Sequence, residues 1–305
     1  MGHDHHEPGP ANYDRAFAIG VGLNLTIVVV QVGLGLVADS LALLADAGHN
    51  LSDVLGLLLA WGAAVLSRRA PTQQRTYGWR RSSILAALAN ALLLIFVTGG
   101  VTWEALRRLA EPHPTEGGIV IVAATVAALV NFGAALLFLK GRHHDMNLRG
   151  AFLHLSADAA VSVGVAITGV AILATGWLWL DPAMSLAIGV VILFSTWSLL
   201  RGATNLVLDA VPDRIDINSV RSYLAELPEV MGVHDLHIWP ISTTETALTV
   251  HLILKSSGLN DALLCEIDDE LHDRFGIEHA TIQLEQHDQQ HDCSLQVVHL
   301  HPANH

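Results

Sequence analysis

Residues 41–66, LALLADAGHNLSDVLGLLLAWGAAVL, decide how this chain is organised. A helix needs about 20 apolar residues to cross the hydrocarbon core of a bilayer, and this stretch exceeds that length. It nevertheless contains His49 and Asp53. An ionisable side chain inside a membrane span raises the free energy of insertion by about 2.5–3.5 kcal/mol. The stretch therefore predicts a transmembrane helix whose polar residues have a function.

Five further stretches have the same apolar character, so we expect a domain of six transmembrane helices. The expected spans are 16–37, 41–66, 83–106, 117–139, 148–175 and 182–206. Of the 305 residues, 51% are hydrophobic and 15% are charged, whereas a soluble domain carries about 25% charged residues. This composition excludes a single soluble enzyme domain.

The charges between the spans predict their orientation. If the N-terminus is inside, ten Lys and Arg residues fall in cytoplasmic segments and only Arg107 and Arg108 fall outside. Cytoplasmic segments of membrane proteins carry such an excess of basic residues. The ten are Arg15, Arg68, Arg69, Arg75, Arg80, Arg81, Lys140, Arg142, Arg149 and Arg201. We therefore expect a multi-pass protein in the lipid bilayer of the inner (cytoplasmic) membrane, with both termini in the cytoplasm.

The residue pattern changes after Pro212. It predicts two helices and three strands in the order αββαβ, which suits a small α+β domain with helices on one face of a sheet. The expected elements are helix 217–227, strand 232–242, strand 246–254, helix 261–275 and strand 280–285. Cys265, beside Leu264 on the second helix, is expected in the core of this domain.

Charge divides the chain at the same place. From Leu206 onward, 4 Lys and Arg residues stand against 17 Asp and Glu residues, which accounts for the whole net charge of −13. A nucleic-acid-binding protein needs basic stripes, so nucleic acid is excluded as a partner. The expected divisions are a disordered His-rich arm 1–15, a membrane domain 16–206, a cytoplasmic domain 207–286 and a His-rich tail 287–305.

The polar motif of the second span recurs in the fifth. His49 and Asp53 are four residues apart, as are His154 and Asp158, so each pair lies on one face of its helix. Two imidazoles and two carboxylates supply the four ligands of tetrahedral Zn²⁺ and neutralise its charge, whereas nitrogen ligands disfavour Mg²⁺ and Ca²⁺. We interpret the four residues as a zinc site that also accepts Co²⁺ and Cd²⁺. Structural hydrogen bonds between helices are the alternative.

Four protein ligands predict carriage of a metal ion rather than catalysis. A catalytic zinc keeps an open coordination position, and the sequence contains no His-Glu-x-x-His motif. We therefore expect neither an enzyme nor a cofactor. Metal and protons compete for imidazole and carboxylate atoms, so an acidic exterior releases metal that was loaded inside. This predicts proton-coupled zinc export by alternating access. The alternative is a membrane-anchored metal sensor whose cytoplasmic domain binds zinc.

These features together resemble the cation diffusion facilitator family, in particular its zinc exporters and zinc/cobalt/cadmium resistance proteins. The resemblance rests on the six spans, the two His-x-x-x-Asp pairs and the segment His234-Asp-Leu-His-Ile-Trp239, and it covers nearly the whole chain. It implies a homodimer, metal/proton antiport and a ferredoxin-like cytoplasmic domain. It also implies that Arg81 and Asp209 form a salt bridge between the membrane and cytoplasmic parts.

The resemblance further implies a zinc site in the cytoplasmic domain, with a structural or regulatory ion. Relatives place cytoplasmic ligands at the positions of His234, His251 and His279, and they draw further ligands from the segment that follows. In this chain that segment contains Cys293, which is therefore a candidate fourth ligand.

Overall fold

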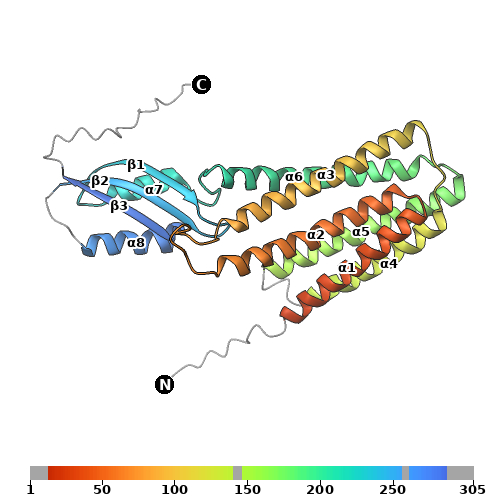
Figure 1. Ribbon diagram of the computed structural model, residues 1–305, viewed down its shortest axis with the longest axis horizontal. Coiled ribbons are helices and arrows are strands. Elements are labelled where there is room, and N and C mark those ends of the chain that lie inside the picture. Colours follow the sequence, from red (N-terminus) through yellow and green to blue (C-terminus); the bar gives the residue numbers. More distant parts are fainter. Residues whose placement is uncertain (1–12, 140–145, 256–260, 287–305) are drawn as a thin grey trace, which may run out of the picture. The chain divides into compact units, whose positions relative to one another are not determined.

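The computed structural model describes residues 13–139, 146–255 and 261–286 (Figure 1). The chain forms two compact units. The first contains the residues up to 59 together with 89–200, and the second contains 60–88 together with the residues from 201 onward. Nearly all of the predicted arm 1–15 and the whole predicted tail 287–305 lie outside the described residues.

Six helices correspond to the six predicted spans. They are α1 (Tyr13–Val37), α2 (Leu41–Ser67), α3 (Ser82–Ala110), α4 (Gly117–Phe138), α5 (Met146–Thr175) and α6 (Leu180–Val207). Helices α2 to α6 are each long and apolar enough to cross a membrane, and a shorter apolar stretch, Val21–Val37, is found in α1. Large side chains such as Phe96 and Phe194 are about four-fifths exposed (81% and 79%), as expected of a surface that faces lipid. The predicted α-helical membrane domain is confirmed.

Helices α4 and α5 pack closely because two glycines face each other. A Cβ atom added to Gly117 would lie 2.9 Å from the backbone oxygen of Gly169, and one added to Gly169 would lie 3.0 Å from that of Gly117. Small residues permit such backbone approach between membrane helices, where van der Waals packing supplies much of the attraction.

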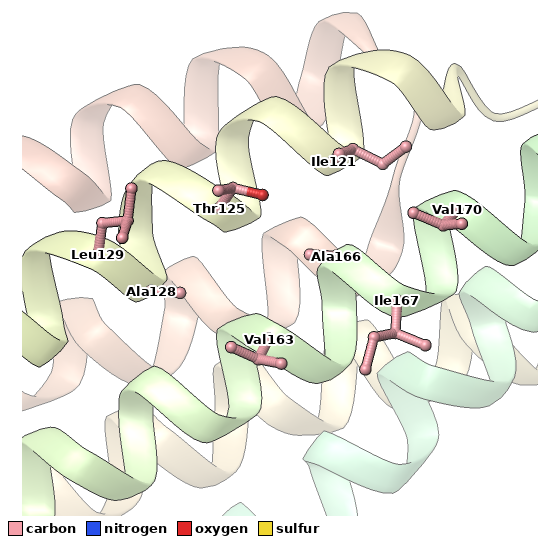
Figure 2. A pocket seen from close by; sticks show the side chains of 8 residues that line it. All are labelled: Ile121, Thr125, Ala128, Leu129, Val163, Ala166, Ile167 and Val170. Carbon is pink, nitrogen blue, oxygen red and sulfur yellow. The ribbon is translucent and has the colours of Figure 1, made fainter.

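An apolar groove runs along the outer side of the same helix pair (Figure 2). Its walls come from α4 and α5 and carry a single hydroxyl, that of Thr125. The lining residues are Ile121, Thr125, Ala128, Leu129, Val163, Ala166, Ile167 and Val170. Such a lining is compatible with the acyl chains of surrounding lipid.

A buried carboxylate from α6 caps the start of α2. Asp181 accepts hydrogen bonds from the Ser40 hydroxyl (2.5 Å) and from the backbone N–H of Leu41 (2.6 Å), and its side chain is completely buried. The first N–H groups of a helix have no partner within the helix, and a carboxylate also interacts favourably with the helix dipole there. Asp181 thus fixes the first turn of α2 to α6.

The C-terminal domain has the predicted αββαβ order. Its elements are α7 (Ile217–Glu226), β1 (Val230–Pro240), β2 (Thr246–Leu254), α8 (Asp261–Phe275) and β3 (His279–Gln286). The sheet order is β1-β2-β3, with β1 antiparallel and β3 parallel to β2. A register shift between His234 and His237 places Asp235 in a left-handed conformation, with φ +50°.

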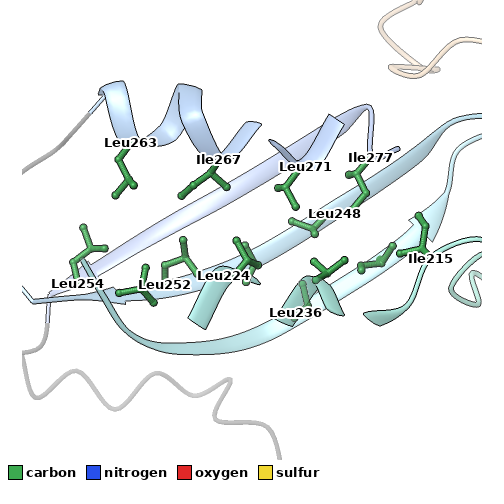
Figure 3. Close-up of a cluster of buried hydrophobic side chains, with 14 residues drawn as sticks. Ile215, Leu224, Leu236, Leu248, Leu252, Leu254, Leu263, Ile267, Leu271 and Ile277 are labelled. Carbon is green, nitrogen blue, oxygen red and sulfur yellow. The ribbon is translucent and has the colours of Figure 1, made fainter. Parts of the chain in front are cut away.

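The core of this domain lies between the sheet and its two helices (Figure 3). Leu224 of α7 and Ile267 and Leu271 of α8 pack with Leu248 and Leu252 of β2, and all five are fully buried. Cys265 is exposed, so its predicted core position is wrong. The reason is the helix period: the buried face of α8 carries residues 263, 267 and 271, and position 265 points away from it.

Candidate metal centre

The four predicted membrane ligands meet because α2 and α5 run antiparallel in matching register. His49 faces Asp158, and one turn along Asp53 faces His154. Both helices carry the same four-residue spacing, so each histidine of one helix stands opposite a carboxylate of the other. The alternation places two nitrogen and two oxygen donors around a shared space.

The distances in this space resemble the edges of a tetrahedron around one ion. Nε2 of His49 is 3.3 Å from Oδ1 of Asp158 and 3.9 Å from Oδ2 of Asp53. Nε2 of His154 is 3.3 Å from Oδ2 of Asp53 and 3.6 Å from Oδ2 of Asp158. Zinc–ligand bonds of about 2.0–2.1 Å in tetrahedral geometry separate neighbouring donors by about 3.3 Å. The donor set therefore fits Zn²⁺.

Three of the four residues form the tighter group. Donor atoms of His49, Asp53 and Asp158 all lie within 4.8 Å of one another. His154 is outside that group, and its ring centroid is 6.1 Å from that of His49. A four-ligand site therefore requires a small movement of the His154 side chain toward His49.

Two carboxylate oxygens at the centre lack hydrogen-bond partners. Oδ2 of Asp53 and Oδ2 of Asp158 are buried, and neither has a partner of good geometry among the described residues. Buried polar atoms are ordinarily satisfied, and a cation satisfies such oxygens directly. This observation also supports a metal site.

The four side chains differ in exposure. The side chain of Asp158 is 2% exposed, those of His49 and Asp53 are 23% exposed, and that of His154 is 48% exposed. One turn beyond His49 and Asp158, the buried Asp46 accepts hydrogen bonds from Gln31 of α1 and Ser162 of α5. Neither Asp46 nor Ser162 is predicted as a ligand from the sequence, although both are about one turn from a predicted ligand.

A second donor cluster lies in the C-terminal domain. The carboxylate of Glu285 accepts hydrogen bonds from Nε2 of His234 (2.9 Å) and Nδ1 of His251 (2.8 Å). The three residues offer donor atoms within 4.8 Å of one another. Oδ2 of Asp235 is 3.6 Å from Nε2 of His251, because the left-handed backbone at Asp235 turns its carboxylate toward the cluster.

The electrostatics of Glu285 reflect its two histidine neighbours. Burial raises the pKa of Glu285, but the hydrogen bonds and charges of His234 and His251 together outweigh burial, so the pKa is lowered. The carboxylate is thus held in the ionised form that a metal requires.

His279 does not lie in this cluster, unlike its predicted position beside His234 and His251. In the parallel pairing of β2 and β3, His279 lies opposite Ala247 and Glu285 lies opposite Ile253. Four residues along a strand separate His279 from the level of His251 by about 13 Å. The position near the two histidines is taken by Glu285. The remaining predicted ligand, Cys293, lies outside the described residues.

His279 instead contacts the loop between α2 and α3. Its Nε2 is 3.0 Å from Nη1 of Arg80, which also donates to Glu245 (2.9 Å), and its ring packs edge-on against Tyr77. The predicted salt bridge lies in the same unit. Nη2 of Arg81 is 2.8 Å from Oδ1 of Asp209, so this prediction is confirmed.

The sequence matches two parts of one protein family. Residues 17–207 match the family domain described as "Cation efflux transmembrane domain", and residues 212–287 match the "Cation efflux protein, cytoplasmic domain". The two matches together cover both groups of candidate ligands.

Several curated proteins are similar over most of the chain. Zinc transporter ZitB of Escherichia coli K12 is 39% identical, over 82% of this chain and 80% of that protein. The metal cation efflux system protein CzcD of Cupriavidus metallidurans is 36% identical, over 93% of this chain and 90% of that protein. The cadmium, cobalt and zinc/H(+)-K(+) antiporter of Bacillus velezensis is 30% identical, over 97% of this chain and 95% of that protein. Among solved structures, the metal-bound C-terminal domain of the CzcD transporter is 36% identical, covers 23% of this chain and 99% of its own, and has a TM-score of 0.22.

Proposed function

Because the chain belongs to the cation efflux family, also called the cation diffusion facilitators, we propose that it exports zinc from the cytoplasm in exchange for protons. The curated relatives named above are a zinc transporter, a metal cation efflux protein and a cadmium, cobalt and zinc antiporter. We propose Co²⁺ and Cd²⁺ as further substrates of this chain.

The observation that carries the proposal is the meeting of four side chains from two antiparallel helices. His49, Asp53, His154 and Asp158 place imidazole nitrogens 3.3–3.9 Å from carboxylate oxygens within the membrane-spanning helices. Ionisable groups in that position have a high insertion cost and are retained where they serve transport. We propose that these four side chains bind the transported ion.

The donor chemistry also supports proton coupling. Zinc binds neutral imidazole and ionised carboxylate, so bound metal and bound protons exclude one another. Lower pH on the receiving side favours protonation of His49 and His154 and hence release of the metal. The site then returns carrying protons, which makes the exchange an antiport. None of these steps changes a covalent bond, so we propose no catalytic role.

The setting of the protein agrees with this role. It is a multi-pass membrane protein, and the match of 212–287 to the family's cytoplasmic domain indicates a dimer. We propose the inner membrane as its location and cytoplasmic termini as its orientation. We further propose the limits 16–206 for the membrane domain and 207–286 for the cytoplasmic domain.

We also propose a zinc ion in the cytoplasmic domain, held by His234, His251 and Glu285. Their donor atoms lie within 4.8 Å of one another, and two imidazoles with one carboxylate supply three of the four ligands that zinc prefers. Cys293 is retained as a candidate fourth ligand. Bound zinc would replace the hydrogen bonds of Glu285, and its role would be structural or regulatory.

Zinc flux in vesicles tests the proposed transport directly. Purified protein is reconstituted with an internal zinc-sensitive dye, and a pH gradient is imposed. We expect gradient-driven zinc flux in the wild type and in Asp213→Ala, an exposed carboxylate in neither donor cluster, and none in Asp53→Ala/Asp158→Ala. Flux that persists in the double variant contradicts the site. Absence of flux in the wild type, with zinc still bound at His234 and His251, supports the metal sensor instead.

A further inference from the structure

A layer of buried polar side chains lies one helical turn beyond the transport site. Asp46 of α2 is completely buried, and its Oδ2 accepts hydrogen bonds from Nε2 of Gln31 in α1 (2.6 Å) and from the hydroxyl of Ser162 in α5 (2.9 Å). Gln31 and Ser162 are themselves at most 1% exposed. A single carboxylate oxygen therefore joins three helices.

This layer follows the same antiparallel register as the ligands. Asp46 precedes His49 by three residues on α2, and Ser162 follows Asp158 by four residues on α5. The Asp46–Ser162 hydrogen bond thus spans the two helices one turn from the point at which His49 and Asp158 approach to 3.3 Å. Since a helix is stiff over a single turn, the length of this link constrains the separation of the ligands.

The first helix reinforces the link through Gln31. The side-chain amide of Gln31 donates to Asp46 and accepts from Nδ2 of Asn50 (3.3 Å), so it bridges positions four apart on α2. Each end of the amide is used, which fixes its orientation. Gln31 therefore orients the Asp46 carboxylate toward α5.

The arrangement retains a carboxylate in an unfavourable place. The hydrogen bonds that Asp46 makes in the described part of the chain come from neutral donors, and its Oδ1 has no partner there. Burying a carboxylate in this way is unfavourable relative to water. An alanine at this position would avoid that cost but would lose both hydrogen bonds, so the structure indicates a function for the link that the acceptor oxygen makes between the helices.

We propose that Asp46 is a positioning residue that fixes the separation of α2 and α5 at the transport site, and thereby sets metal affinity and the preference for zinc over cadmium. The proposal rests on the proposed function of His49, Asp53, His154 and Asp158. Donors held at short spacing favour the smaller Zn²⁺, because geometry discriminates between ions that accept the same ligands. When the helices are free to separate, the larger Cd²⁺ is accommodated equally well.

Metal binding by purified full-length variants tests the proposal. Zinc and cadmium affinities are measured by competition with a chelating dye, for Ser162→Ala, Asp46→Leu and Asp46→Asn. We expect Ser162→Ala to weaken zinc binding about tenfold, as for one lost hydrogen bond to a charged group, and cadmium binding much less. Asp46→Leu should weaken zinc binding more than Ser162→Ala does. Asp46→Asn keeps an acceptor of the same shape and should restore most of the preference for zinc over cadmium.

Asp181→Asn is the matched control. Asp181 is also completely buried and also accepts hydrogen bonds at α2, but at its first turn. We expect unchanged zinc and cadmium affinities in this variant. Equal losses in Asp181→Asn and Ser162→Ala would overturn the proposal, as would wild-type affinities in Asp46→Leu. If Asp46→Leu does not fold, Ser162→Ala, which lacks a single hydroxyl, decides the result. Wild-type zinc binding by Asp53→Ala/Asp158→Ala would instead contradict the transport site itself.

Discussion

The imidazole of His279 accepts a hydrogen bond from the guanidinium of Arg80, with 3.0 Å between Nε2 and Nη1. Arg has donors only, so the histidine nitrogen is the acceptor. Arg80 also pairs with Glu245 at 2.9 Å. A histidine used in this way is not available to the donor cluster of His234 and His251.

Substitution of His279 should therefore spare the proposed cytoplasmic zinc site. In a background that lacks the transport site, Asp53→Ala/Asp158→Ala, we expect His251→Ala to weaken zinc binding at least tenfold and His279→Ala to change it less than twofold. Calorimetric titration with zinc measures both. A comparable loss in His279→Ala would show that this residue is a ligand after all.

Neighbouring glycines of α4 should respond differently to alanine. A Cβ at Gly117 would meet the backbone of Gly169 at 2.9 Å, whereas one at Gly118 would meet nothing within 4 Å. We expect Gly117→Ala to destabilise the protein by about 1–3 kcal/mol, as overpacking does. Gly118→Ala should be neutral or stabilising by up to about 1 kcal/mol, because alanine is the better helix former. Thermal unfolding in detergent compares the two, and equal midpoints would contradict the close packing of α4 and α5.

Removal of the α2 cap should reduce stability without affecting zinc affinity. Asp181→Ala leaves the Ser40 hydroxyl and the Leu41 N–H without their buried acceptor. Such a loss amounts to about 1–3 kcal/mol. The unfolding midpoint of this variant is compared with that of Asp213→Ala, whose exposed side chain should make little difference. A midpoint in Asp181→Ala equal to that of the wild type would disprove the capping role.

The stability of the metal-free cytoplasmic domain should fall at acidic pH through Glu285. Its pKa is lowered in the folded state, so its contribution is complete above the ordinary Glu pKa and is lost as pH falls through the lowered value. Urea unfolding of the chelator-treated protein between pH 3 and pH 7 measures this dependence. In Glu285→Gln we expect a flatter profile on the acidic side, and an unchanged slope would show that Glu285 contributes nothing to it.

The meeting of the four candidate membrane ligands could be predicted because its information is local. The apolar stretch of residues 41–66 specifies a span by length alone, and the four-residue spacing of His49 and Asp53 specifies a shared helix face. The second His-x-x-x-Asp pair, His154 and Asp158 in α5, then supplies the other two candidate ligands. The link between Asp46 and Ser162 could not be predicted, because single polar residues in a span are common hydrogen-bonding groups and their contact depends on packing between helices.

The cytoplasmic donor cluster could be predicted only in part from the sequence, because its composition depends on strand register. His234 and His251 are directly paired across β1 and β2, but the level of β3 beside them follows from a parallel pairing that no local pattern encodes. A different alignment of β3 would have placed His279 near His251. The bulge at Asp235 is likewise visible only once the strands are paired.

The cap at the start of α2 holds that helix at a point remote from the candidate ligands. Its first turn is bonded to α6 through Asp181, and at 1.5 Å per residue His49 lies about 13 Å and Asp53 about 20 Å along the helix from Ser40. The Asp46–Ser162 hydrogen bond, about 9 Å along, is nearer to both. The two ends of α2 thus have separate duties: the cap contributes to the stability of the helix bundle, and the spacing of the ligands depends on contacts between α2 and α5.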